Sequence, residues 1–310
     1  MLSFFLSPKD DLQAVLNGLK EPAEIHLSKG IYNRKLEILS DGVTLIGESA
    51  AETVISFNDF AKKLDEKGLE YTTFKSQTLR ICANGVTLKN LTVENSVKDP
   101  VKYGQCVALS VHGDNFYAEN VILKSTQDTL FLSPFPDDLV VRYQNFLPSY
   151  CLYKEGENLQ VFKNCKIYGT VDFIFGCGKA LFYGCDLISL NDGREYGYVC
   201  APAHSLAQKT GFVFYGCRFS AEGAKEGTVY LARPWRDFGK CTFINCRLDN
   251  CINPLLFDKW NDTARDKTAR FEYFNLDCAF KLHPVSWCKS LTPDGAENII
   301  KYIKTKCGTN

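Results

Sequence analysis

The sequence predicts an all-β protein folded as a right-handed parallel β-helix, a solenoid with a short helix at each end. Two observations support this prediction. A strand–turn–strand unit recurs along most of the chain, and each unit is too short to bury its own apolar face, so neighbouring units must stack. The 310 residues are enough for one large core. We therefore expect a single domain over residues 1–310.

Each repeated unit consists of a short strand, a turn at Asn or Gly, and a second short strand. The spacing between equivalent positions varies from 20 to 44 residues. Such spacing is too irregular for a propeller, but it fits a solenoid whose coils carry loops of different length. The residues that directly follow the turns are Leu91, Val121, Cys165, Cys185, Cys217 and Cys246.

A helix is predicted at each end of the solenoid. Residues 10–19 (DDLQAVLNGL) begin with acidic residues and carry apolar residues at helical spacing. A helix there would cap the open end of the solenoid. Residues 292–302 are predicted as a C-terminal helix, with Thr292 as the N-cap and Pro293 at the first helical position.

The charge balance excludes several kinds of partner. Lys+Arg and Asp+Glu are equal at 36 each, which gives no electrostatic case for a nucleic-acid or membrane partner. No apolar stretch approaches the about 20 residues of a membrane span. The N-terminal segment is too short, and too soon acidic, for a signal peptide. We therefore expect a cytoplasmic protein.

The 14 cysteines are expected to be free thiols. No Cys-x-x-Cys occurs, so a zinc ribbon or a redox motif is not favoured. Four cysteines fall at the same phase of successive repeats, which predicts an inward stack of small apolar side chains rather than disulfides or a metal site. Many unpaired buried thiols are typical of a reducing compartment.

Two short strings hold the candidate chemistry. In residues 169–176 (GTVDFIFG), Asp172 stands among apolar residues, where a carboxylate is costly to bury unless it has a partner or a task. In residues 127–130 (QDTL), Asp128 adjoins the amide of Gln127. Two carboxylates in different environments, with amide donors nearby, suit covalent acid/base chemistry on a carbonyl.

Other hydrolytic mechanisms are less well supported by the residues. There is no GxSxG, and the 4 histidines lie outside the repeated motifs, so a Ser-His-Asp hydrolase fits poorly. No His/Asp/Glu cluster has the spacing of metal ligands. We therefore expect neither a metal nor another cofactor.

The two strings, with residues 105–109 (QCVAL) and 231–235 (LARPW), resemble the four motifs of the pectin methylesterases and occur in that family's order. The resemblance covers most of the chain, and the combination of VDFIFG, RPW and QDTL is highly specific. It implies a parallel β-helix that removes methyl esters from galacturonate and releases methanol. Departures from the usual pattern, none at a residue needed for catalysis, occur at Arg34, Cys106, Phe131 and Ala232.

The resemblance also implies roles for the charged residues. Asp172 would be the nucleophile that forms an acyl-enzyme anhydride, and Arg233 beside it would hold the pKa of Asp172 down. Asp128 would protonate the departing methanol and then act as base for the hydrolytic water, which requires a raised pKa. The alternatives are a structural Asp172 or Asp128 in a turn and a plain surface salt bridge for Arg233.

The uncharged residues of the motifs are assigned in the same way. Gln105 and Gln127 would donate amide hydrogens to the oxyanion, where losing one donor typically costs on the order of 10²–10³ in rate. Trp235 would stack on a galacturonate ring. Alternatively, the two glutamines belong to a polar ladder between coils and Trp235 fills the core.

The expected substrate depends on the expected location. Polymeric pectin does not enter cells, so short imported methylated oligogalacturonides are favoured over pectin itself. Three other functions stay open: an esterase or thioesterase on another ester with the same acid pair, a non-catalytic carbohydrate-binding β-helix, and a pectate lyase or polygalacturonase. The lyase would need an acidic calcium cluster, which the sequence does not offer. No oligomeric state is predicted.

Three long departures from the repeat, residues 58–76, 134–158 and 258–270, are expected to be functional or mobile. The second could wall a sugar groove or form a dimer contact, or it could be an ordered side flap. Its aromatic side chains are Tyr143, Phe146, Tyr150 and Tyr153.

Overall fold

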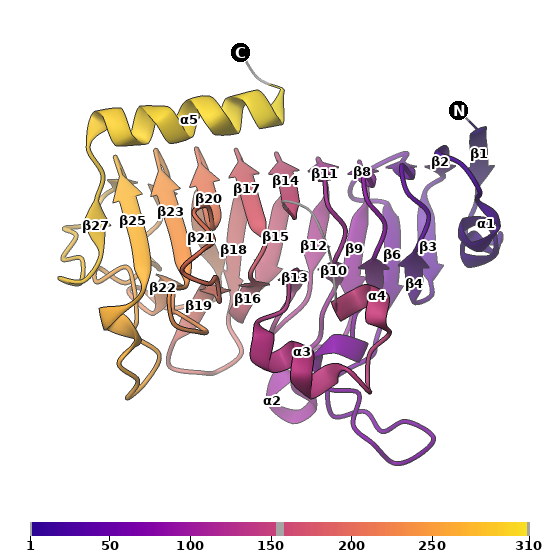
Figure 1. Cartoon of the computed structure of the whole chain (residues 1–310), viewed down its shortest axis with the longest axis horizontal. Helices are drawn as coiled ribbons and strands as arrows, with labels where there is room; N and C mark the ends of the chain where they lie inside the picture. Colours follow the sequence, from indigo (N-terminus) through magenta and orange to yellow (C-terminus); the bar gives the residue numbers. More distant parts are fainter. Residues whose placement is uncertain (1, 153–157, 309–310) are drawn as a thin grey trace.

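The computed structural model describes residues 2–152 and 158–308, which form a right-handed parallel β-helix (Figure 1). Three sheets of 11, 7 and 9 strands run along the solenoid, and the ladders between their strands are parallel. In the 11-stranded sheet the order is β1 (Leu2–Leu6), β2 (Ala23–Leu27), β5 (Thr44–Gly47), β8 (Thr87–Lys89), β11 (Phe116–Glu119), β14 (Leu159–Lys163), β17 (Lys179–Tyr183), β20 (Phe212–Tyr215), β23 (Lys240–Ile244), β25 (Arg270–Phe274) and β27 (Lys289–Ser290).

The other two sheets take the remaining strands of each coil. The 7-stranded sheet contains β4 (Leu36–Ile38), β7 (Leu79–Ile81), β10 (Leu109–Val111), β13 (Leu130–Leu132), β16 (Val171–Gly176), β19 (Gly197–Pro202) and β22 (Val229–Ala232). The 9-stranded sheet contains β3 (Gly30–Asn33), β6 (Thr53–Phe57), β9 (Thr92–Asn95), β12 (Ile122–Lys124), β15 (Lys166–Gly169), β18 (Asp186–Leu190), β21 (Arg218–Glu222), β24 (Arg247–Leu248) and β26 (Asp277–Cys278).

The predicted turn at Asn or Gly is confirmed in the coils from β8 onward. It joins the 11-stranded to the 9-stranded sheet through one residue in the left-handed region, such as Asn90 (φ 53°) or Asn120 (φ 54°). Asn tolerates this conformation better than most residues. The Asn120 side chain also donates a hydrogen bond of 2.8 Å to that of Asn90, which links successive turns. The residue after each predicted turn points inward and is at most 1% exposed.

The interior is a stack of equivalent side chains, as predicted. Four phenylalanines of the 11-stranded sheet, Phe162, Phe182, Phe214 and Phe243, stack face to face with ring centroids 4.6–4.9 Å apart. The four in-phase cysteines lie beside them and are buried. All 14 cysteines lie in the described part of the chain, and none of them forms a disulfide there, as predicted. The solenoid is therefore held by apolar contact between coils.

Both predicted helices are present. Helix α1 (Leu12–Gly18) begins at the Asp11 cap and buries Leu12 and Leu16 at the N-terminal end of the solenoid. Helix α5 (Pro293–Cys307) has the predicted Thr292 cap but continues beyond the predicted end at Tyr302. It lies along the outer face of the 11-stranded sheet, where it contacts β14 and β17 (Figure 1). No helix in the described part of the chain is long and apolar enough to span a membrane.

The three long departures from the repeat carry the remaining elements except α2. We call residues 134–152 the flap; it contains α3 (Asp137–Tyr143) and α4 (Ser149–Leu152). Tyr153, predicted as part of the same aromatic set, lies outside the described residues. The other short helices are η1 (Thr73–Lys75), α2 (Pro100–Tyr103) and η2 (Arg265–Lys267).

Candidate active site

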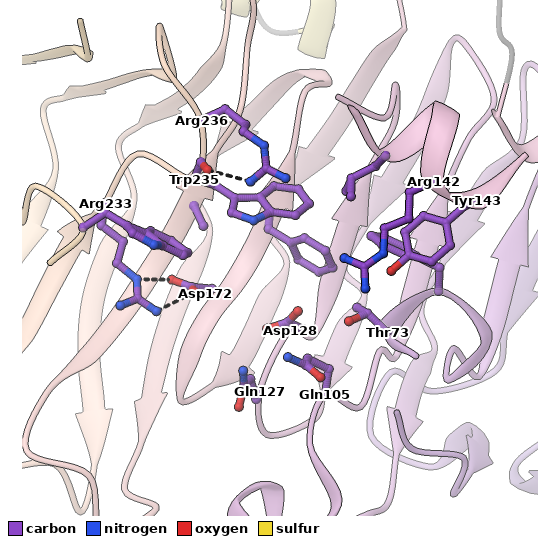
Figure 2. Close-up of a pocket in the computed structure, with 15 residues that line it drawn as sticks. Thr73, Gln105, Gln127, Asp128, Arg142, Tyr143, Asp172, Arg233, Trp235 and Arg236 are labelled. Carbon is purple, nitrogen blue, oxygen red and sulfur yellow. Dashed lines mark hydrogen bonds and ion pairs between the residues drawn. The ribbon is translucent and has the colours of Figure 1, made fainter. Parts of the chain in front are cut away.

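The six residues predicted for chemistry and substrate binding line one pocket of about 320 Å³. The pocket lies against the 7-stranded sheet. Two strands of this sheet contribute lining residues, Phe175 from β16 and Ala201 from β19. In Figure 2 the two carboxylates and the two glutamine amides face the same opening. The predicted residues are Gln105, Gln127, Asp128, Asp172, Arg233 and Trp235.

The stacking of coils brings these residues together. Gln105 precedes β10, Asp128 precedes β13 and Asp172 lies in β16, which are successive strands of one sheet. The backbone of Cys106 donates to the Gln127 carbonyl at 3.1 Å, and that of Asp128 donates to Val171 at 3.2 Å. Residues far apart in sequence thus occupy adjacent rungs, about 4.8 Å apart.

Both carboxylates stand where the backbone departs from regular strand geometry. Asp128 (φ 63°) and Asp172 (φ 50°) are in the left-handed region, which Asp adopts more readily than most non-glycine residues. The pairing of β16 with β19 shifts register between Val171 and Ile174. A side chain at Gly169 would lie 2.2 Å from Phe173, so this position must be glycine. A left-handed residue within or beside a strand interrupts the regular ladder, and such departures cluster at functional sites.

Arg233 holds Asp172 in a two-pronged ion pair. Its Nε and Nη2 atoms donate to the two carboxylate oxygens at 2.8 and 2.7 Å. The guanidinium lies between two aromatic rings, 3.8 Å from the centroid of Tyr198 and 4.0 Å from that of Trp260. Sequence reasoning assigned no role to Tyr198 and missed Trp260. The sequence feature that could have indicated Trp260 is its position in the loop 258–270, which departs from the repeat and was expected to be functional or mobile.

Arg233 lowers the pKa of Asp172, as predicted, but the net shift of that pKa is upward. Burial raises the pKa of Asp172, and the charge and hydrogen bonds of Arg233 oppose this rise without cancelling it. The effect of desolvation on the pKa of Asp172 is thus larger than the opposing effect of its ion pair with Arg233. Asp172 is only 7% exposed.

The raised pKa predicted for Asp128 is confirmed. Burial raises the pKa of Asp128 well above its ordinary value, and the negative charge of Asp172 raises it further. Arg233 acts in the opposite direction on both acids but makes its hydrogen bonds only to Asp172. Asp172 therefore ionises first, and Asp128 keeps its proton to higher pH.

The two glutamines differ in how they are held. The Gln127 side-chain oxygen accepts a hydrogen bond of 2.8 Å from Arg194, whose Nε lies 3.6 Å from Asp192. Because its oxygen is occupied, Gln127 turns its amide hydrogens toward Asp128, whose pKa a hydrogen bond from the Gln127 side chain lowers. Gln105 lines the same pocket. Arg194 was not found by sequence reasoning, because it lies between repeats and in none of the motifs.

Trp235 packs against neighbouring side chains and also borders the pocket. It is half-buried, packs edge-on against Phe175 with centroids 5.7 Å apart, and lies under the guanidinium of Arg236. It also lines the pocket. This placement suits stacking on a sugar ring, and sugar binding by Trp235 stays a prediction.

All three long departures from the repeat reach the pocket. Residues 58–76 supply Thr73 and Phe74, and the loop 258–270 supplies Trp260. The flap supplies Leu139, Arg142 and Tyr143, so it forms part of the pocket wall. A dimer contact by the flap stays untested.

One group of potential metal ligands, Cys82, His112 and Cys151, occurs among the described residues, where sequence spacing indicated none. It is buried between the flap and the solenoid and does not line the pocket. The ring nitrogens of His112 bond to Ser110 at 2.7 Å and to the Cys151 carbonyl at 2.9 Å. With both nitrogens occupied, the group acts as a hydrogen-bonded junction.

Comparison with known proteins gives a consistent match. The Pectinesterase family model matches residues 5–134 and 137–302. Pectinesterase QRT1 of Arabidopsis thaliana is 30% identical over 87% of this chain and 66% of its own length. Probable pectinesterase/pectinesterase inhibitor 23 of the same plant is 27% identical over 94% of this chain and 48% of its own length. The chain thus spans less than two thirds of these two relatives.

A solved structure agrees in fold along nearly the whole chain. The crystal structure of a pectin methylesterase in complex with a hexasaccharide matches with a TM-score of 0.77 and 25% identity. The match covers 96% of this chain and 94% of that one.

Proposed function

The chain belongs to the pectinesterase family, and we propose that it hydrolyses the methyl esters of galacturonate units and releases methanol. The observation that carries the proposal is the division between two carboxylates in one pocket. Asp172 is paired with Arg233, whereas Asp128 has a pKa raised well above its ordinary value. One acid is thus equipped to attack and the other to donate a proton.

In the first half-reaction an Asp172 oxygen attacks the ester carbonyl carbon. The negative charge that develops on the carbonyl oxygen accepts hydrogen bonds from the amides of Gln105 and Gln127. Collapse of this intermediate breaks the bond to the methoxy group, which takes the proton of Asp128 and leaves as methanol. The product is an anhydride between Asp172 and the sugar carboxyl group.

In the second half-reaction water hydrolyses the anhydride. Asp128, now a carboxylate, accepts a proton from the water as the water attacks the sugar carbonyl. The bond between the sugar carbonyl carbon and the Asp172 oxygen breaks, so Asp172 leaves as a carboxylate beside Arg233, and the sugar is released as galacturonic acid, which gives its proton to the solvent. Asp128 is again protonated, so the cycle needs no further group.

The finer substrate proposal is a short, methylated oligogalacturonide in the cytoplasm. The free thiols support a reducing compartment, where polymeric pectin is absent. The flap and the loop 58–76 wall the pocket, which favours a short chain over a long one. The matching pectin methylesterase structure holds a hexasaccharide.

Methanol release from two methylated substrates, with acetate release from an acetylated sugar as the control, tests the function. We expect methanol from methylated trigalacturonate with a higher kcat/KM than from polymeric pectin, and no acetate from an acetylated sugar. Hydrolysis of the acetylated sugar without methanol release would indicate an esterase of different specificity. Faster turnover of the polymer would contradict the oligomer proposal alone.

A further inference from the structure

One basic side chain of the pocket lacks an acidic partner within the described residues. The pocket is lined by three arginines. Arg233 is neutralised by Asp172, and Arg236 donates two hydrogen bonds to Asp138 at 3.1 and 2.7 Å. Arg142, exposed on α3 of the flap, forms no ion pair with any residue that the structure describes. Its positive charge is therefore available to a solute in the pocket.

The helix that carries Arg142 is fixed in place. Its neighbours Leu139 and Tyr143 are 4% and 7% exposed, and the Tyr143 ring packs edge-on against Phe74 at 5.2 Å. The Asp138–Arg236 pair joins the start of α3 to the segment after β22. Arg142 therefore projects from a rigid wall, and in Figure 2 its guanidinium points into the pocket.

The position of Arg142 suits one particular ligand chemistry. A galacturonate unit presents either a neutral methyl ester or a carboxylate. A guanidinium binds a carboxylate through charge-assisted hydrogen bonds that are about twice as strong as neutral ones. The ionised carboxylate of Asp172 would repel a second anion, so a free carboxylate needs a cation on the opposite wall.

We infer that Arg142 binds the free carboxylate of a galacturonate unit that flanks the ester under attack. The enzyme then prefers partly de-esterified chains to fully methylated ones, and the flap is the element that sets this preference. The inference rests on the proposed function, because it takes the substrate class from it.

The test compares monomethylated with fully methylated trigalacturonate for the wild type and three variants. We expect Arg142→Gln to lower the ratio of the two kcat/KM values about tenfold, the effect of one lost charge-assisted contact. Arg142→Lys should keep part of the preference, since it keeps the charge. Arg247→Gln is the matched control, because Arg247 is 66% exposed and lies outside the pocket.

Binding of unesterified trigalacturonate, measured by calorimetry, gives a second readout that needs no turnover. We expect Arg142→Gln to weaken it about tenfold and Arg247→Gln to leave it unchanged. An unchanged substrate ratio, an equal loss on both substrates, or unchanged binding would overturn the inference. Failure of the wild type to release methanol from either substrate would instead overturn the proposed function, and the binding measurement would still decide the role of Arg142.

Discussion

The interior of the solenoid and the pocket on its side use the same repeating backbone in opposite ways. Inside, equivalent positions carry equivalent apolar side chains, such as the stack from Phe162 to Phe243. In the pocket, adjacent rungs carry two carboxylates in left-handed conformations, with burial raising the pKa of both. The comparison teaches that regular positions stabilise this fold, and that the chemistry lies where the repeat is broken.

The largest expected effect is the loss of catalysis without loss of fold. Asp172→Asn removes the nucleophile, and Asp128→Asn removes the proton donor. Each should lower methanol release by at least about 10³-fold, as expected for an essential catalytic group, while circular dichroism stays that of the wild type. Loss of the β-helix signal in either variant would show that the pocket also holds the fold together.

A core variant should show the opposite pattern. Phe214→Ala removes a fully buried ring from the middle of the interior stack. We expect it to lower the free energy of unfolding by about 3–5 kcal/mol, measured by denaturant titration, and to leave kcat/KM of the folded protein within a few-fold of the wild type. A large kinetic defect at unchanged stability would contradict the separation of the two regions.

Substitution of Trp235 tests whether this residue belongs to the pocket or to the solenoid interior. Because Trp235 is half-buried and lines the pocket, Trp235→Ala should raise KM by about tenfold, the effect of losing one aromatic sugar contact. Its melting temperature should stay close to that of the wild type. A large drop in melting temperature with unchanged KM would place Trp235 in the core.

The smallest effect is a gain in stability at the site. A raised pKa in the folded state means that stability is lost as the pH rises through that pKa, since the unfolded chain releases the proton more readily. Burial raises the pKa of Asp128 in this way. Asp128→Asn should therefore raise the melting temperature at pH 7, and the gain should vanish near pH 3, where both states are protonated. A gain that is independent of pH would have another cause.

The sequence predicted the parts of the molecule that repeat. The turn at Asn90 and its equivalents, the inward cysteines and the cap at Thr292 follow from local residue preferences. The six site residues were found through a family resemblance, and the stacking of coils brings them together.

The remaining features depend on packing between segments that do not repeat. Trp260 packs on the guanidinium of Arg233, and Arg194 donates a hydrogen bond to Gln127. Each contact joins a loop to a distant coil. The hydrogen-bonded junction between His112 and the flap has the same origin. The net direction of the Asp172 pKa shift could not be predicted from the sequence because it depends on the extent of burial, which the ion pair alone does not reveal.

The central claim is that Asp172 acts ionised while Asp128 acts protonated, and the pH dependence of kcat/KM tests it most directly. We predict a bell-shaped profile, with an acidic limb from Asp172 above its ordinary pKa of 3.8 and a basic limb from Asp128 at higher pH. Arg233→Ala should move the acidic limb upward, because Arg233 opposes the rise in the pKa of Asp172. An acidic limb that stays in place in Arg233→Ala, or substantial activity in Asp172→Asn, would contradict the account.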